Sequence, residues 1–417
     1  MAEHESTAIT TDKADLGKLG PMGAVLAVIG GLLFFVLGPG ITGGMDHLYG
    51  SYMFGLLFWT LITLGCLGMG LLHHTVRGTW SVSVMRLFES GGGAASLLLM
   101  AVLFIPIIVL PGAMHSLYEW THAEVVKNDP ILTHKAPWLN ETRWVACLVL
   151  YFAIWILWST IMRRSTLKQD ESKNFKLEAG RMSWGAVGMV VFAVTSTFAS
   201  VDWIMSMEPH WYSTMYGLCV VINACYGALA IATVFVTSNA RKEPYKSIMS
   251  HFLTRDIGNM LFVLTMLWGY TTLSQFLIIW NGNIPETTSY YQKRMAMYPD
   301  GMQGNWWAVL GFILIIGTFF VPFYCLLAPR VKKYTQNLRS IGIWMFLMCI
   351  LNVYMLVIPA LPGRGELGPI SKFTLPDIFA WMFVGGLWLV VFGAISRRAP
   401  LVPLYDTRLQ EAASNAH

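Results

Sequence analysis

The chain has 417 residues, of which 55% are hydrophobic and only 12% are charged. Soluble domains carry about 25% charged residues, so this composition excludes an ordinary soluble protein and predicts one surrounded mainly by lipid. The formal net charge of +5 says little by itself, and we expect no nucleic-acid partner. The apolar runs are long and continuous rather than short and alternating, which predicts an all-α integral membrane protein and not a β-barrel.

Ten apolar runs are long enough to cross a bilayer, since about 20 helical residues span its ~30 Å hydrocarbon core. They lie near residues 21–38, 51–73, 90–111, 143–162, 183–203, 212–237, 257–280, 305–328, 340–360 and 376–396. Residues 1–20 are polar and lack the pattern of a cleaved signal peptide, so we expect them to form a cytoplasmic tail, as residues 397–417 do. Pro106 and Pro322 lie inside runs and predict kinks in the third and eighth helices.

Basic residues predict the orientation of the chain. Three quarters of the 28 Lys and Arg residues lie in the two tails and in the loops after even-numbered helices. Cytoplasmic loops carry such an excess, so the sequence predicts a multi-pass protein of the bacterial inner membrane with both termini in the cytoplasm. The longest connections, 112–142 and 281–304, then face the periplasm, where their aromatic residues suit partner docking or contact with lipid headgroups.

The cysteines and histidines do not have the pattern of a redox centre. The six cysteines fall inside predicted spans without a CxxC pair, whereas iron–sulfur clusters and covalent haem need closely spaced cysteines. The ten histidines lie in loops, in the tails or at helix ends, where they cannot face one another across a bundle as haem ligands. We expect no metal and no covalently bound cofactor.

A group of titratable side chains surrounds the turn between the fifth and sixth spans. Asp202 closes the fifth span, and Glu208 and His210 follow it on the predicted periplasmic side. Three further residues are predicted near the same surface: Asp46, His47 and His115. Carboxylates and histidines can be tuned to exchange protons near neutral pH, so these residues are candidates to accept protons from an oxidised quinol. The alternative is a solvated interfacial turn anchored by aromatic residues.

The seventh span carries a second polar line. Asp256, Asn259, Tyr270 and Ser274 fall within about 80° of one another at 100° per residue. Buried polar groups on one face would support a water-assisted proton path, and the alternative is interhelical hydrogen bonding. The stretch between Asn259 and Tyr270 is apolar, so such a path needs other helices. Glu89, at the start of the third span, is a further candidate.

Several segments of the sequence resemble a known family. The most specific is residues 200–214, SVDWIMSMEPHWYST. The weaker ones are residues 72–74 (LHH), 80–82 (WSV), 117–120 (LYEW), 138–140 (WLN), 256–259 (DIGN), 274–280 (SQFLIIW) and 322–323 (PF), with Arg330 and Lys333. Together they are similar to the F subunit of bacterial alternative complex III, a relative of the NrfD-like membrane subunits. The resemblance covers nearly the whole chain.

The resemblance implies two four-helix bundles, helices 2–5 (about 51–203) and helices 6–9 (about 212–360), with helices 1 and 10 at the periphery. It implies a subunit, not catalytic alone, of a complex that oxidises quinol and passes electrons to cytochrome c or to a terminal oxidase. The implied partners are a larger NrfD-like paralogue, an iron–sulfur subunit, multihaem and monohaem cytochrome c subunits, small membrane subunits and a terminal oxidase. Lipids and a quinone, either menaquinone or ubiquinone, are the implied bound molecules, and proton conduction would use the carboxylates and polar face named above.

Two rival functions stay open at this point. Ten helices with intramembrane polar residues also allow a secondary transporter, which would have broken helices in matching positions of its two halves. A purely structural membrane anchor would need none of the named side chains for proton transfer.

Overall fold

A computed structural model of the chain describes residues 14–42, 45–76, 78–295, 297–298, 301–302, 306–361 and 375–409. These residues are overwhelmingly helical. One antiparallel pair of two-residue strands, β1 (Met297–Tyr298) and β2 (Gly301–Met302), interrupts the helices.

Ten helices in the described ranges are long and apolar enough to cross a membrane. In chain order they comprise η1 (Ala14–Lys18), α1 (Leu19–Leu32), η2 (Leu33–Leu37) and α2 (Gly38–Thr42); α3 (Met45–Thr75); α4 (Met85–Gly91) and α5 (Ala94–Val109); α9 (Glu141–Ser172); α10 (Lys176–Trp203); α11 (Tyr216–Ser238); α13 (His251–Gly282); α15 (Trp306–Leu314), η5 (Ile315–Phe320) and α16 (Val321–Leu327); α18 (Thr335–Val357) and η6 (Ile358–Ala360); and α19 (Leu375–Ser396).

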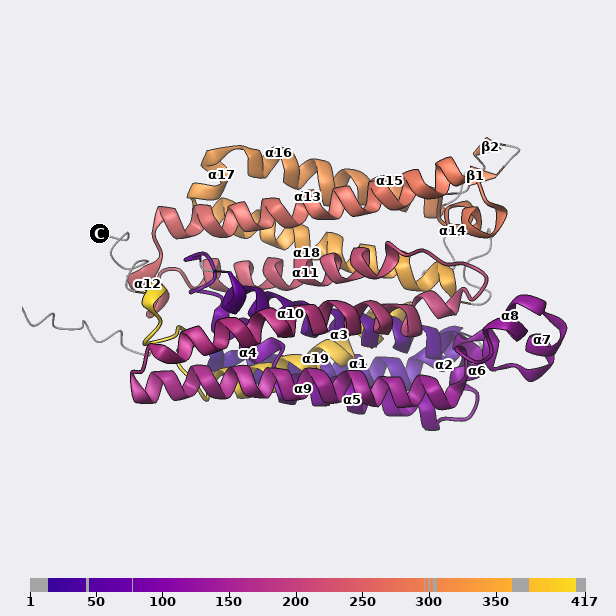
Figure 1. Cartoon of the computed structure of the whole chain (residues 1–417), viewed down its shortest axis with the longest axis horizontal. Helices are drawn as coiled ribbons and strands as arrows, with labels where there is room; N and C mark the ends of the chain where they lie inside the picture. Colours follow the sequence, from indigo (N-terminus) through magenta and orange to yellow (C-terminus); the bar gives the residue numbers. More distant parts are fainter. Residues whose placement is uncertain are drawn as a thin grey trace, which may run out of the picture.

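Shorter elements connect these spans. They are α6 (Ala113–Leu117), η3 (Glu119–Thr121), α7 (Ala123–Asn128), α8 (Pro130–Lys135), η4 (Met205–Met207), α12 (Tyr245–Ile248), α14 (Pro285–Met295) and α17 (Pro329–Lys333). Figure 1 shows the spans running along the long axis of the molecule, with α6 to α8, α14 and the strand pair at one end and α12 and α17 at the other. The two long connections predicted from the sequence are therefore largely helical and project from the same end.

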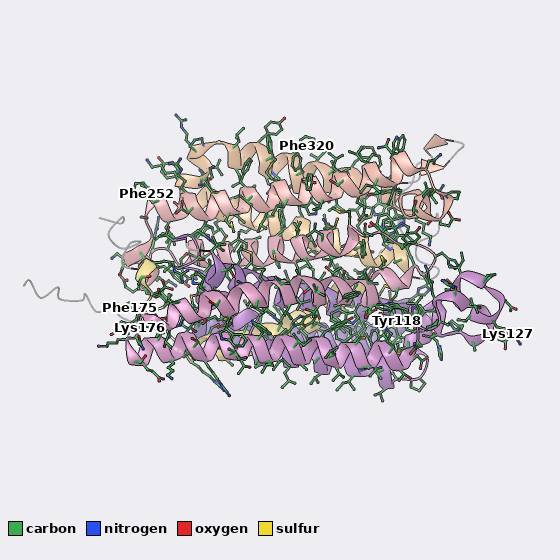
Figure 2. The ribbon with its side chains drawn as sticks, viewed as in Figure 1. Tyr118, Lys127, Phe175, Lys176, Phe252 and Phe320 are labelled. Atoms are coloured by element: carbon green, nitrogen blue, oxygen red, sulfur yellow. The ribbon has the colours of Figure 1, made fainter. Side chains whose placement is uncertain are left out.

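Both described ends of the chain lie at one end of the bundle. The Arg397 guanidinium, just after α19, donates hydrogen bonds to the carbonyl oxygens of Leu16 (3.0 Å) and Gly17 (2.5 Å). We call this the terminal end and the other the opposite end. In Figure 2, Lys176 lies at the terminal end, whereas Lys127 lies at the opposite end.

The number and order of the predicted spans are confirmed, since each apolar run overlaps one observed span. Several helices are longer than their apolar runs, as in α9, which extends well past residue 162. Asn140 caps the start of α9 by accepting a hydrogen bond from the backbone N–H of Arg143 (2.8 Å). Lys173 ends α9 in a left-handed conformation with φ 54°. Polar capping residues therefore set the helix ends that hydropathy alone does not locate.

The third span differs from the prediction, because it is broken into α4 and α5 at Gly92 and Gly93. A Cβ atom on Gly92 would lie 2.4 Å from the backbone nitrogen of Leu67 on α3. The break thus lets this backbone approach α3 more closely than any side chain would allow. In the eighth span, Pro322 is the second residue of α16, which follows the π-helical segment η5. A π-helical segment is an irregularity of the kind expected where proline removes a backbone N–H.

Helix α3 lies at the centre of the molecule and is almost entirely buried. It packs against α10, α11 and α19, and α19 packs in turn against α1. The contact between α1 and α19 is made by glycines, since a Cβ on Gly386 would lie 2.3 Å from the backbone nitrogen of Ala27. Gly386 thus allows α19 to pack closely on α1, as Gly92 allows its backbone to pack closely on α3.

Candidate functional site

Asp202 lies at the opposite end of the bundle, on the last turn of α10, and its side chain is 1% exposed. Its carboxylate accepts hydrogen bonds from the guanidinium of Arg143 (3.0 Å) and the hydroxyl of Tyr151 (2.7 Å), both on α9. The indole of Trp144 donates to the Asp202 carbonyl oxygen (2.9 Å). The carboxylate is therefore buried, ion-paired and hydrogen-bonded, and not part of a solvated turn.

Side-chain contacts continue from Asp202 toward the centre of the molecule along α9 and α10. The Tyr151 ring stacks on Trp155, with centroids 5.9 Å apart. The Trp155 indole donates to the hydroxyl of Thr195 (2.8 Å). Since Thr195 and Asp202 are seven residues apart on one helix, this line reaches about 10 Å from Asp202.

Glu208 pairs with a buried arginine from a distant part of the chain. Its carboxylate lies 3.0 Å from the guanidinium of Arg294, which is 3% exposed, and 3.3 Å from the ammonium of Lys293. Burial alone would lower the pKa of Arg294, but Glu208, Tyr290 and Tyr216 together outweigh burial and raise that pKa. The same guanidinium lies 3.8 Å from the Tyr290 ring centroid, and burial raises the pKa of Tyr290 to about 12. The ion pair between Glu208 and Arg294 therefore holds α14 against the turn after α10.

His210 belongs to a third, exposed pair. Its Nε2 lies 2.5 Å from Oδ2 of Asp129, the N-cap of α8. This hydrogen bond is the main reason that the pKa of Asp129 lies below its usual value, and backbone N–H groups of α8 add to the effect. Asp202, Glu208 and His210 thus lie on one turn, but each has its own partner, and no hydrogen bond joins their side chains in the described ranges.

Two of the three residues predicted near the same surface, His47 and His115, do not join this site. His47 is exposed at the start of α3. His115 is exposed on α6, with its Nδ1 2.7 Å from the hydroxyl oxygen of Thr121. The side chain of Asp46 lies outside the part of the chain that the structure describes.

Glu89 belongs to a dense buried network at the terminal end. Its carboxylate accepts hydrogen bonds from the guanidinium of Arg86 (2.6 Å) and the hydroxyl of Thr166 (2.6 Å). The same guanidinium pairs with Asp170 of α9. Arg163 donates to the Glu89 carbonyl oxygen (2.9 Å). Arg86 is 4% exposed, so its charge is compensated almost entirely by these two carboxylates.

Residues 397–409, which we call the C-terminal segment, close this network. The Leu404 backbone N–H donates to the Asp170 carboxylate (3.1 Å), and the Arg408 guanidinium donates to the His73 carbonyl oxygen (2.9 Å). Asp406 pairs with Arg408 (2.6 Å) and lies 3.8 Å from Nε2 of the fully buried His73. Burial by itself would raise the pKa of Asp406, but His73 and Arg408 outweigh it and hold that pKa well below its usual value. The predicted C-terminal tail is therefore packed into the bundle through these residues.

The polar line on the seventh span does not form a buried path. The Asp256 carboxylate accepts from Thr79 (3.1 Å), and the Asn259 side chain accepts from the ammonium of Lys332 (2.8 Å). Tyr270, further along α13, is 68% exposed, and Ser274 is half-buried. Asp256 and Asn259 therefore lie close to the terminal end, whereas Tyr270 lies on the outer surface.

No group of three or more His, Cys, Asp or Glu residues that could hold a metal ion occurs within the described ranges. The six cysteines form no disulfide, and each is buried or half-buried.

Sequence reasoning missed the partner of each carboxylate, although a signal was present. Few basic residues lie in the loops of the predicted periplasmic side, and three of them, Arg143, Lys293 and Arg294, pair with Asp202 and Glu208. Most Lys and Arg residues lie on the predicted cytoplasmic side. A basic residue on the other side is therefore expected where a buried carboxylate needs a partner. For the terminal-end network, no sequence signal connected His73 with Asp406.

No known protein family and no curated protein matches the sequence.

Proposed function

We propose that this chain is a membrane subunit of a quinol-oxidising electron-transfer complex of the alternative complex III type, with both termini in the cytoplasm of a bacterium. Its partners supply the redox centres, and the chain exchanges protons at the two ends of its first helix group. The proposal rests on the family resemblance together with one structural observation. The buried carboxylate of Asp202 lies in the same helix group as the buried network around Glu89. Side-chain contacts lead inward from this carboxylate, by a hydrogen bond from Tyr151, a ring stack on Trp155 and a hydrogen bond to Thr195.

Buried ionisable side chains at both ends of the first helix group support proton exchange for a physical reason. Ionisable side chains at membrane depth are rare and usually mark ion or proton routes. Asp202, Tyr151 and Thr195 reach inward from the opposite end, and Arg86, Glu89 and Asp170 occupy the terminal end. Together these residues provide two partial proton routes along α9 and its neighbouring helices, one from each end of the bundle. Internal water is required to carry protons from one route to the other.

The helix contacts support a grouping into two bundles. Helices α3, α5, α9 and α10 contact one another in a ring, and α11, α13, α16 and α18 form a second ring. Contact between α3 and α11 joins the two groups, and α1 and α19 pack outside. These contacts support the two-bundle arrangement that the resemblance implies for the F subunit.

The transporter alternative receives less support. The third span is broken at Gly92 and Gly93, but its counterpart in the second group, α13, is continuous over 32 residues. Matching interruptions in both halves are expected around a transporter's central site. The structural anchor stays a direct rival, because the arginine pairs of Asp202 and Glu208 would also hold helices together without moving protons.

Membership of a redox complex is tested by purification. An affinity-tagged copy of the chain, expressed in its native host and extracted in mild detergent, is expected to co-purify with covalent haem c and with iron–sulfur proteins. Haem absorbance and metal analysis of the eluate provide the readout. A stable, monodisperse chain that elutes alone would overturn the proposal.

Proton exchange is tested with the isosteric variant Asp202→Asn in the assembled complex. Glu124→Gln, on exposed α7, is the matched control. With reconstituted vesicles, we expect Asp202→Asn to slow proton release during quinol oxidation by about 100-fold, the lower end of the range for one acid–base group, while haem content is unchanged. Equal proton release and quinol oxidation in both variants would favour the structural anchor.

A further inference from the structure

Tyr270 lies on the outer surface of α13, and Ser274 lies on the same side of the helix, about 40° around it at 100° per residue. Among the residues that the structure describes, neither hydroxyl has a hydrogen-bond partner, whereas those of Thr265 and Thr271 donate to carbonyl oxygens one turn earlier (both 2.9 Å). A serine hydroxyl can turn to such a carbonyl, but a tyrosine hydroxyl, at the far end of its ring, cannot. Tyr270 therefore presents an unpaired polar group to whatever surrounds α13.

The position of Tyr270 along α13 corresponds to the centre of a bilayer. It is eleven residues after Asn259, which accepts from the Lys332 ammonium, and ten before Trp280, which is 59% exposed. These separations are about 16 Å and about 15 Å of helix. Lysine and exposed tryptophan are typical of the membrane–water interfaces, which lie about 15 Å from the centre of the hydrocarbon core. Lipid chains offer no hydrogen bond at that depth, so a hydroxyl facing them would be costly.

The surface around Tyr270 has the shape of a helix-packing face. We call it the outer stripe of α13, and its members are Val263, Leu267, Tyr270, Ser274 and Leu277. The three apolar members are each 41–45% exposed. The members are separated alternately by four and three residues, which is the spacing by which two helices contact along a left-handed crossing. The stripe covers about 21 Å of helix, so it can pack along one neighbouring helix through most of the hydrocarbon.

We propose that the outer stripe of α13 binds one transmembrane helix of another membrane subunit, which has a small residue opposite Tyr270. A small residue leaves room for the ring and brings its backbone carbonyl or hydroxyl within reach of the Tyr270 hydroxyl. A second copy of this chain, related by a two-fold axis along the membrane normal, would place its own Tyr270 there, and the two rings would compete for the same space. A quinone carbonyl would accept one hydrogen bond but leave the rest of the stripe facing lipid. The inference goes beyond the proposed function, since it needs a second membrane subunit but no redox centre.

The first test removes the hydroxyl and keeps the ring. The assembled complex containing Tyr270→Phe is purified in mild detergent and diluted into micelles, and native mass spectrometry measures the fraction of chains that have lost a membrane subunit. We expect the dissociation constant of that subunit to rise about 3- to 20-fold, the effect of losing one interhelical hydrogen bond. Tyr324→Phe is the matched control and should leave it unchanged. Tyr324 is 65% exposed but lies three residues before the end of α16, beside the basic helix α17, where headgroups and water satisfy its hydroxyl.

A second test identifies what lies against the stripe. The photoreactive residue p-benzoylphenylalanine replaces Leu273, which is 57% exposed beside Tyr270, and native membranes are irradiated. We expect a cross-link to a transmembrane helix of the subunit that Tyr270→Phe releases. Adducts only with lipid, with a quinone or with a second copy of this chain, or equal dissociation of the two phenylalanine variants, would overturn the inference.

The two proposals fail in different ways. A chain that cross-links to such a helix but co-purifies with no haem or iron–sulfur protein would support this inference and contradict the proposed function. A complex that contains the redox proteins but gives only lipid adducts at this position would contradict the inference and leave the proposed function standing.

Discussion

The pair of Arg143 and Asp202 is asymmetric, because the arginine side chain is 19% exposed and the aspartate only 1%. Arg143 also stacks over Trp138, 3.4 Å from its ring centroid, so it keeps favourable contacts without the carboxylate. Asp202 without Arg143 would be a buried charge held mainly by Tyr151. The two partners should therefore respond differently to substitution.

We predict that Arg143→Gln destabilises the protein by about 3–5 kcal/mol, the range for stranding one partner of a buried ion pair. Asp202→Asn should lower stability by only about 1–2 kcal/mol, since asparagine still accepts the hydrogen bond from Tyr151 and Arg143 still reaches solvent. Thermal unfolding in detergent measures both. The control is Arg164→Gln on the exposed surface of α9, which should behave as the wild type. Equal losses for the two substitutions would contradict this account of the pair.

Asp406 makes docking of the C-terminal segment depend on pH. Its pKa in the folded protein is held below the usual value by His73 and Arg408, against the effect of burial. A carboxylate with a lowered pKa stabilises the folded state above its unfolded pKa, near 4, and this contribution is lost as the pH falls through the folded value. The segment should therefore stay docked at pH 5 and loosen only below about pH 4.

Hydrogen exchange of peptides from residues 397–409, corrected for the intrinsic pH dependence, measures this loosening. In Arg408→Gln the segment should exchange faster and detach at a higher pH, because one of the groups that lowers the Asp406 pKa is gone. Arg398→Gln, which alters an exposed arginine of the same segment, is the matched control. If the segment of the wild type loosened between pH 7 and pH 5, another group would govern its docking.

At the scale of elements, α1 is held to the molecule chiefly by its contact with α19. Helices within lipid gain no hydrophobic driving force from each other, so close packing through small residues has to hold them. The Cβ of an alanine at Gly386 would meet backbone atoms of α1, 2.3 Å from Ala27 N and 2.5 Å from Gly23 O. Backbone atoms cannot rotate away as a side chain would, and the two helices must separate.

We predict that Gly386→Ala lowers stability by about 1–3 kcal/mol, as expected for overpacking. Gly180→Ala on α10, where a Cβ meets nothing within 4 Å, should instead be neutral or stabilising by up to about 1 kcal/mol, because alanine favours the helix. Thermal unfolding with proteolysis of α1 as a second readout distinguishes the two. Wild-type stability in Gly386→Ala would show that α1 has another attachment.

At the scale of the whole molecule, ten spans return the chain to the side from which it started. The charge bias predicts that this terminal end is cytoplasmic. Figure 2 shows Lys127 and Lys176 at opposite ends, and both are exposed. In a variant without the six native cysteines, Lys127→Cys should react with a membrane-impermeant maleimide in spheroplasts, and Lys176→Cys only after permeabilisation. The reverse pattern would invert the proposed orientation, and labelling of both without permeabilisation would contradict ten spans.

The sequence by itself determined the number of spans, their order and the shared side of the two termini. Each span must cross the same thickness of hydrocarbon, so its signal of about 20 apolar residues is local and needs no knowledge of its neighbours. The irregularity near Pro322 was predictable for the same reason, because proline acts on its own helix.

Only the tertiary structure decided which side chains meet. Arg143 and Asp202 are 59 residues apart, Arg294 and Glu208 are 86 apart, and His73 contacts a segment near the other end of the chain. Periodicity could not supply these pairs, because in a membrane protein the outer and inner faces of a helix are both apolar. For that reason a polar line on the seventh span predicted an interior path, whereas Tyr270 lies on the outside. Which face turns inward is settled by close packing, as at Gly92 and Gly386, and by the burial of charges in pairs.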